Sequence, residues 1–229
     1  LRHALRCCST LLGRRLDWSP PAPVGPISVI GAEADDRPAV MVVFYRAHLV
    51  AGDTATIERL LAAVRRQGLA AFGVAITSLK DPAIADDLGR LIRDRKPAVI
   101  LNATAFSGRR EHDTTVLDAA DAPVLQVVLS GSAREAWQAS SRGLAPADLA
   151  MNVVLPELDG RLLSRAISFK EKTTVDPRLE FARVLHQPHS DRVEYVAQLA
   201  AAWARLGRTP RAERRLALVL SDYPARGGR

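Results

Sequence analysis

The feature that most constrains the fold of this chain is a regular alternation of short apolar runs with amphipathic segments. Four apolar runs follow one another, and between them apolar residues recur every three or four positions, as on one face of a helix. The runs are AVMVVFY (39–45), LAAFGVAI (69–76), AVILNATAF (98–106) and PVLQVVLSG (123–131). Strands that are apolar on both faces and separated by helices predict an α/β fold with a parallel, doubly wound (Rossmann-like) sheet.

Changes in composition divide the chain into four predicted regions. Residues 1–38 combine a basic helical start with a Pro-rich linker, and residues 39–150 form the parallel α/β domain. Residues 151–207 predict a smaller β-containing extension, with strands at 152–155 and 164–170, followed by a C-terminal amphipathic helix. Residues 208–229 predict a strand and a Gly-rich turn with no further element after them, which indicates the truncated start of a following domain. The first residue is not Met, so we expect a piece of a longer protein.

Polar residues mark the predicted starts of the helices. Asp53 and Asp81 are placed as N-caps, and Pro82 suits the first helical position after Asp81. Ser132 opens a capping box with Glu135, and Ser190 caps the last helix.

The charge distribution argues against nucleic acid as a partner. The net charge of +7 comes from the two ends, which carry +4 and +5 and leave the middle at −2. Aromatic and basic residues do not alternate as they do in proteins that stack on bases. No apolar stretch is long enough to span a membrane, and no signal peptide follows residue 1. Two adjacent cysteines suit reduced thiols, so a cytoplasmic location is expected.

Several polar side chains follow the predicted strands, where parallel sheets bind their ligands. Arg46 and His48 come after the first strand, and Asn102 ends the third. A histidine in such a loop more often bonds to backbone than to a ligand. The pair His186 and His189 has a proline between its members and no evident third ligand, which argues against a metal site there.

The stretch NVVLPELDG (152–160) places two carboxylates, Glu157 and Asp159, just past an apolar run. They suit either a turn with solvated charges or a base and metal ligand at the mouth of a cleft. Nucleotide chemistry is not indicated, since the chain has neither a G-x-x-x-x-G-K-[ST] loop nor a G-x-G-x-x-G fingerprint.

Six blocks, in order, resemble a known family. They are VFYRAHLVAGDTATI, ITSLKD, LNATAFS, APVLQVVLSGSAREAW, SSRGLAPADLAMNVVLPELDGR and AISFKE. Together they are similar to the large subunit of aerobic cobaltochelatase, which in turn is similar to the H subunit of magnesium chelatase. The similarity covers about residues 38 to 175 and extends more loosely to 229.

The resemblance implies a function. Such subunits bind a tetrapyrrole and insert a divalent metal, here Co²⁺ as the substrate metal entering a corrin precursor of cobalamin, hydrogenobyrinic acid a,c-diamide. ATP and Mg²⁺ are used by partner motor subunits of the AAA+ class, and the remainder of the large subunit is a further partner. The isolated chain is expected to be inactive.

The resemblance also implies roles for particular residues. Glu157 is the first candidate for catalysis and for metal binding, and His48 is the second in both roles. Arg46, Asn102 and Arg134 are candidates for substrate binding. The sequence leaves cobalt and magnesium open as the inserted metal.

Two alternatives stay open. The chain could be a non-catalytic scaffold or docking segment of a magnesium-chelatase-type subunit. It could also be an independent small-molecule-binding α/β domain of the periplasmic-binding-protein type, although a signal peptide is missing.

Overall fold

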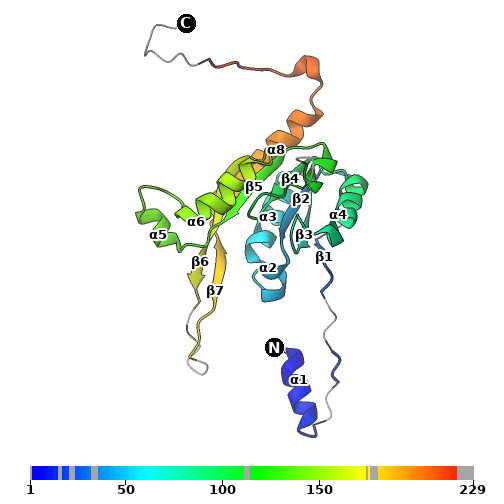
Figure 1. The fold of residues 1–229 in the computed structure, drawn as a ribbon, viewed down its shortest axis with the longest axis vertical. Coiled ribbons are helices and arrows are strands. Elements are labelled where there is room, and N and C mark those ends of the chain that lie inside the picture. Colours follow the sequence, from blue (N-terminus) through cyan, green and yellow to red (C-terminus); the bar gives the residue numbers. More distant parts are fainter. Residues whose placement is uncertain are drawn as a thin grey trace.

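A seven-stranded mixed sheet forms the centre of the computed structural model, which describes residues 2–14, 17–20, 24–31, 36–110, 114–173, 175 and 180–220 (Figure 1). Its strand order is β1-β3-β2-β4-β5-β6-β7. The pairs from β3 through β6 are parallel, whereas the edge strands β1 and β7 run antiparallel to their neighbours. The strands are β1 (Ile27–Ile30), β2 (Ala39–Tyr45), β3 (Ala70–Ile76), β4 (Val99–Asn102), β5 (Val124–Leu129), β6 (Leu162–Lys172) and β7 (Val184–Pro188).

The helices follow the strands in the order that the sequence predicts for the first half of the chain. They are α1 (Arg2–Leu11), α2 (Arg46–Ala51), α3 (Ala55–Arg66), α4 (Pro82–Arg95), η2 (Val116–Ala120), α5 (Arg134–Ala139), α6 (Pro146–Leu149), η3 (Ala150–Val154), α7 (Leu155–Glu157), α8 (Ser190–Arg208) and η4 (Arg211–Glu213).

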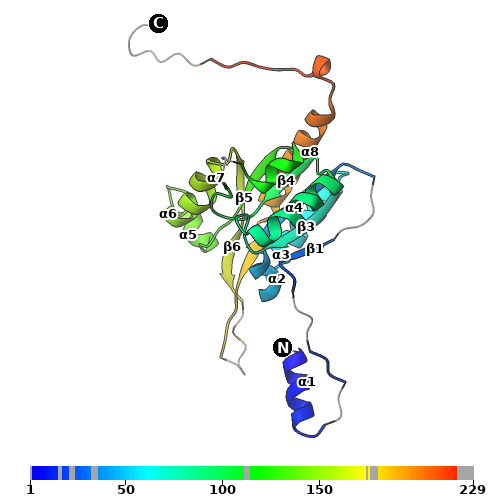
Figure 2. The same ribbon diagram turned by 45° about the vertical axis from the view of Figure 1, so that its right-hand side comes forward.

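Two apolar layers sandwich the sheet, which confirms the doubly wound α/β prediction. On one face α3 and α8 pack against strands β2 to β6 through a cluster that includes Phe44, Leu60 and Val196. On the other face α4 and η2 cover the sheet through a second cluster that includes Met41 and Leu88. Figure 2 shows α4 lying over the strands. Because successive side chains of a strand point to opposite faces, both layers draw on the same strands, which explains their continuously apolar sequences.

The sheet extends past residues 39–150 at both edges. Strand β1 lies within the expected linker and pairs with β3, and the hairpin β6–β7 continues the sheet beyond β5. Strand β6 confirms the predicted strand at 164–170, but β7 was not predicted. The division of the chain into four regions stays a prediction.

The predicted strand at residues 152–155 is wrong, because this stretch is helical. The segment α6–η3–α7 runs continuously from Pro146 to Glu157, with a π-helical turn in its middle. The buried positions Asp148, Asn152 and Pro156 recur every four residues, which is a helical period, while Val154 is half exposed. Pro156 has no N–H and its ring would crowd an ordinary α-helical turn. The π turn before it already interrupts the α-helical ladder, so the proline is accommodated.

Several predicted caps also differ from the structure. Asp81 caps α4 through a hydrogen bond from the Ala83 N–H at 3.0 Å, as predicted. Asp53 does not cap α3, because its carboxylate accepts a tertiary hydrogen bond instead. The side chain of Ser132 does not cap α5, and α8 begins at Ser190 with His189 as its N-cap residue. Of these residues, Asp53 has a tertiary partner in place of the local cap.

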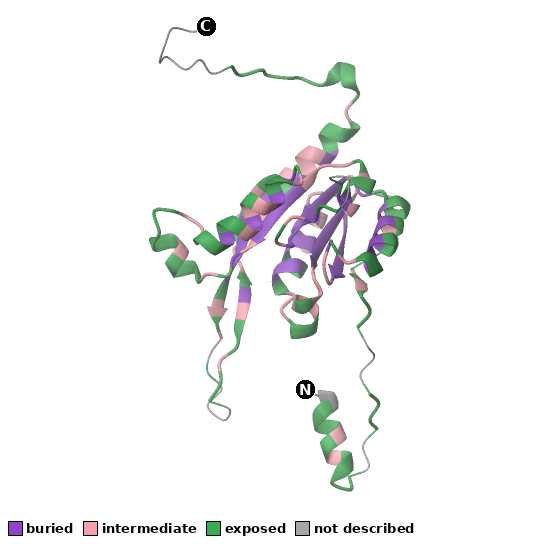
Figure 3. Cartoon of the chain, in the orientation of Figure 1, coloured by how far each residue is buried: buried purple, intermediate pink, exposed green. Residues whose placement is uncertain are grey.

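The C-terminal segment is extended and exposed rather than a strand. Residues 214–220 have no regular structure, and the four apolar side chains Leu216, Leu218, Val219 and Leu220 are 83–92% exposed. Figure 3 shows the contrast with the buried sheet. The remaining residues of this predicted strand and turn, 221–229, lie outside the described part of the chain. Within the described residues, no helix combines the length and apolar character that crossing a membrane requires.

Candidate functional site

Most of the predicted site residues lie at or near the edge of the sheet where the parallel strands end. The polypeptide leaves β2 into α2, β3 into the loop before α4, β4 into the loop 103–110, and β5 into the loop before α5. Parallel topology brings these segments to one edge, which is where ligands of such sheets bind.

Glu157 stands at the end of α7 and is exposed. It lines a small cavity of about 90 Å³ together with Gln126, Val153, Pro156, Arg161 and Leu163. Its carboxylate is therefore solvated in this chain, at the mouth of that cavity. The geometry places an exposed acid in the lining of a cavity that the buried cation Arg161 also lines.

Asp159 is the buried member of the two carboxylates. It forms an ion pair with Arg161, and the two side chains are 0% and 2% exposed. Its carboxylate also accepts hydrogen bonds from the Ser107 hydroxyl and from the Gly108 N–H, the latter at 2.7 Å. Burial lowers the pKa of Arg161, and the charge of Asp159 opposes that effect. Asp159 therefore fastens the loop after β4 to the end of α7.

Asn102 belongs to the same buried network and does not face solvent. Its amide donates to Gln126 Oε1 at 2.8 Å and to the Thr104 carbonyl at 3.1 Å. Gln126 Oε1 in turn accepts from the Arg161 guanidinium at 3.1 Å. Buried side chains of β4, of β5 and of the residue before β6 are thus joined by hydrogen bonds. Asn102 therefore has a structural role here, supporting the loop after β4.

His48 lies on α2 and meets two residues from distant parts of the chain. Its Nδ1 is 3.6 Å from Asp53 Oδ2, and its ring stands edge-to-face against His186 of β7 with centroids 5.3 Å apart. Asp53 Oδ1 accepts the backbone N–H of His186 at 3.0 Å. His186 Nδ1 lies 3.2 Å from the buried Ser168 hydroxyl. The ligand atoms of His48, Asp53 and His186 all lie within 4.8 Å of one another.

Burial keeps both imidazoles of this group neutral at neutral pH. It lowers the pKa of His186 from 6.5 to about 4, with Asp53 opposing the shift and the charges of His48 and Lys170 adding to it. It also lowers the pKa of His48, again against the effect of Asp53. A neutral imidazole keeps a nitrogen lone pair, which is the form that binds a metal.

The two arginines that we assigned to substrate binding are placed differently from each other. Arg46 is half-buried and donates to the carbonyls of Val24 and Gly25 at 3.1 and 3.2 Å, so it holds the segment before β1. Arg134 is exposed on the first turn of α5. Their roles toward a substrate stay predictions.

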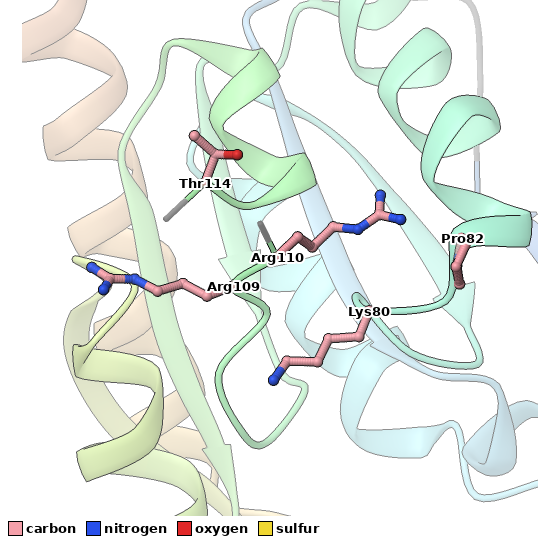
Figure 4. Close-up of a pocket in the computed structure, with 5 residues that line it drawn as sticks. All are labelled: Lys80, Pro82, Arg109, Arg110 and Thr114. Atoms are coloured by element: carbon pink, nitrogen blue, oxygen red, sulfur yellow. The ribbon is translucent and has the colours of Figure 1, made fainter. Parts of the chain in front are cut away.

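A separate basic pocket of about 600 Å³ opens between the loops after β3 and β4. Lys80, Pro82, Arg109, Arg110 and Thr114 line it (Figure 4). Figure 4 shows Arg110 extending toward Pro82 at the start of α4, whereas Arg109 extends in the opposite direction. Lys80 and Arg110, two cations on one open pocket, suit a ligand with carboxylates.

Sequence reasoning missed three of these residues as parts of a site. Asp53 was predicted as a cap, His186 lies in a strand that was not predicted, and Lys80 was not singled out. His48 and Asp53 lie five residues apart in the sequence, which was a usable signal for a shared site. His186 joins them only through the tertiary fold. His112, a further histidine in the loop after β4, lies outside the described residues.

Comparisons with known proteins point to the same family. A family model described as CobN/Magnesium Chelatase matches residues 21–229. The chain is 42% identical over 204 residues to the aerobic cobaltochelatase subunit CobN of Sinorhizobium sp, with 88% of this chain and 16% of that protein covered. It is 26% identical over 236 residues to the H subunit of magnesium chelatase from Rhodobacter capsulatus, with 91% and 18% covered.

A solved structure is also similar. The catalytic subunit of cobaltochelatase from Mycobacterium tuberculosis superposes with a TM-score of 0.72 at 27% identity, covering 89% of this chain and 18% of that one. The chain therefore spans less than a fifth of the length of these relatives.

The buried pair predicts a large stability effect at Asp159. Asp159→Asn leaves Arg161 buried without a counter-charge, so we expect the free energy of unfolding to fall by about 3–5 kcal/mol in urea titrations. Asp87→Asn is the matched control, because its pair with Arg90 is exposed and such pairs contribute about 0–1 kcal/mol. A loss below about 1 kcal/mol for Asp159→Asn would contradict this structural role.

The lowered pKa of His186 predicts acid sensitivity. His186 is protonated near pH 6.5 in the unfolded chain but only near pH 4 in the folded chain. The stability that its neutral form contributes above pH 6.5 is therefore lost as the pH falls toward 4. Between pH 7 and pH 4, we expect the unfolding free energy of the wild-type chain to fall by about 1–3 kcal/mol more than that of His186→Gln. Parallel curves for the two proteins would show that His186 is not buried in its neutral form.

Proposed function

The chain belongs to the CobN/magnesium chelatase family, and on this premise we propose that it forms part of a metal-inserting large subunit acting on a tetrapyrrole. The proposed metal is Co²⁺ as substrate, and the proposed tetrapyrrole is a corrin precursor, hydrogenobyrinic acid a,c-diamide. The observation that carries the proposal is the position of Glu157. This carboxylate lines a small cavity beside the buried Arg161, at the end of the helical segment that leads into β6, and the loop that follows it is anchored by the buried Asp159–Arg161 pair.

Metal insertion sets two chemical requirements that a carboxylate can meet. The ring nitrogens must give up their protons, and the incoming ion must exchange its water ligands for nitrogen. Glu157 is proposed to accept a proton as a general base, and its oxygens can also bind the ion as it loses water. The exposure of Glu157 in this chain implies that another part of the large subunit, or the tetrapyrrole itself, covers it during the reaction.

The basic pocket suits the acidic side groups of such a substrate. Lys80 and Arg110 face an open volume of about 600 Å³, within the range of small-molecule sites. We propose that they bind peripheral carboxylates, while the ring lies along the carboxyl edge toward Glu157. Arg134 is a further candidate for such a contact, since it is exposed. Arg46 would act indirectly, through the segment that it holds.

Other components complete the proposed activity. AAA+ motor subunits would use ATP and Mg²⁺, in a cytoplasmic complex, and the remainder of the large subunit would supply the other wall of the site. The exposed apolar side chains at 216–220 suit burial against that remainder. The chain by itself is therefore expected not to complete insertion.

Replacing Glu157 tests the proposed base. In the full-length protein, Glu157→Gln removes the charge and the basic atom but keeps the shape, so insertion should fall by roughly two to four orders of magnitude. Tetrapyrrole affinity should change only a few-fold. The rates come from the absorbance change on metal insertion, and affinities from titration with the metal-free ring.

Glu213→Gln serves as the control, because Glu213 is exposed on η4, which follows α8 in the chain. Near-normal insertion by Glu157→Gln would overturn the role of base and favour a scaffold role for this segment.

Removing charge from the basic pocket tests the proposed substrate contact. Lys80→Gln combined with Arg110→Gln should raise the Kd for the tetrapyrrole by roughly three- to tenfold, because each exposed ion pair contributes about 0.2–1 kcal/mol. The effect should shrink as salt is added. Arg90→Gln, an exposed change on α4, is the control. An unchanged Kd in the double variant would place the carboxylates elsewhere.

A further inference from the structure

The group formed by His48, Asp53 and His186 has the composition of a transition-metal site. Two imidazoles and one carboxylate come from α2, from the loop after it and from β7. Imidazole nitrogen suits cobalt, nickel, copper, iron and zinc, whereas Mg²⁺ prefers oxygen ligands in an octahedral arrangement. The donor set therefore favours a transition metal over magnesium.

Distances within the group fit a small ion better than direct bonding between the side chains. The 3.6 Å between His48 Nδ1 and Asp53 Oδ2 is too long for an ordinary hydrogen bond. Two donors about 2.1 Å from one tetrahedral ion lie about 3.4 Å apart. With all three donor atoms within 4.8 Å of one another, small side-chain rotations are enough to close them around an ion.

The surrounding contacts hold the ligands in place as in known metal sites. Asp53 has one oxygen fixed by the His186 N–H, which leaves the other directed at His48. Ser168 occupies the Nδ1 side of His186, so Nε2 is the nitrogen left for an ion. Such outer partners fix the tautomer and the ring orientation of metal-binding histidines.

The site is open enough for an ion to enter and to leave. The side chains of His48 and Asp53 are 18% and 12% exposed to solvent. Three ligands leave coordination positions for water or for another donor. Lys170 stands opposite His186 in the β6–β7 register, and its positive charge is felt by both histidines. A nearby cation weakens the binding of a second cation, which suits an ion held in transit.

We propose that His48, Asp53 and His186 bind a divalent transition-metal ion, with Co²⁺ as the matching substrate, and hold it before transfer to the tetrapyrrole. The transfer step rests on the proposed function, whereas the binding site does not. Binding alone can therefore be tested without tetrapyrrole, ATP or partner subunits.

The test titrates the purified chain with CoCl₂, following the visible d–d bands and measuring bound cobalt by equilibrium dialysis. One Co²⁺ should bind per chain, and a tenfold excess of Mg²⁺ should not displace it. His48→Ala and His186→Gln should each weaken binding by at least about tenfold, the scale found for lost metal-site partners. His189→Gln, a change at a histidine outside the group, should leave binding unchanged.

Lys170→Gln separates a metal site from a merely structural cluster, because it should tighten Co²⁺ binding by roughly two- to fivefold. Far-UV circular dichroism checks that each variant is folded. If His186→Gln does not fold, His48→Ala still tests the site, because His48 lies on the half-buried helix α2. Co²⁺ binding that is absent, or unchanged in the histidine variants, overturns the site. If binding is lost but the full-length protein carrying His48→Ala inserts cobalt normally, the transfer step is overturned and the site stands.

Discussion

The buried ion pair between Asp159 and Arg161 is the interaction on which the carboxyl edge depends. Asp159 receives hydrogen bonds from the loop after β4, and Arg161 reaches Gln126 of β5 and, through it, Asn102 of β4. Water is excluded from the pair, so its electrostatic attraction is strong and the loss of one partner is costly. The position of Glu157, two residues before Asp159, follows from this anchoring.

The structure offers three chemically different features that metal insertion could use. The exposed carboxylate of Glu157 lines a small cavity, a basic pocket opens between the loops after β3 and β4, and two neutral histidines lie with an aspartate where α2 meets β7. Parallel topology brings the ends of β2 to β5 to one edge, and β7, which runs antiparallel to β6, brings His186 beside α2. Burial explains the protonation of the histidines, because desolvation disfavours the charged form.

The sequence predicts the strands β2 to β5 and the helices α3 and α4 well, because strands buried on both faces and amphipathic helices have distinct periods. It fails at residues 152–157, where Val153, Val154 and Leu155 suggest a strand although the burial pattern is helical. It also fails wherever a polar side chain has a tertiary partner. Asp53 is bonded to His186, and Asp159 is paired inside the fold, and neither contact follows from local sequence. The family resemblance supplied Glu157 and His48, but Asp53 and His186 are joined to His48 only by the fold.

The central claim is that tetrapyrrole and metal meet at the carboxyl edge of this sheet. The most direct measurement is a structure of the full-length protein with the metal-free tetrapyrrole bound. The account predicts that the ring lies along this edge, with its carboxylates near Lys80 and Arg110 and its pyrrole nitrogens facing Glu157. A ring bound elsewhere, touching neither Glu157 nor the loops after β2, β3 and β4, would contradict it.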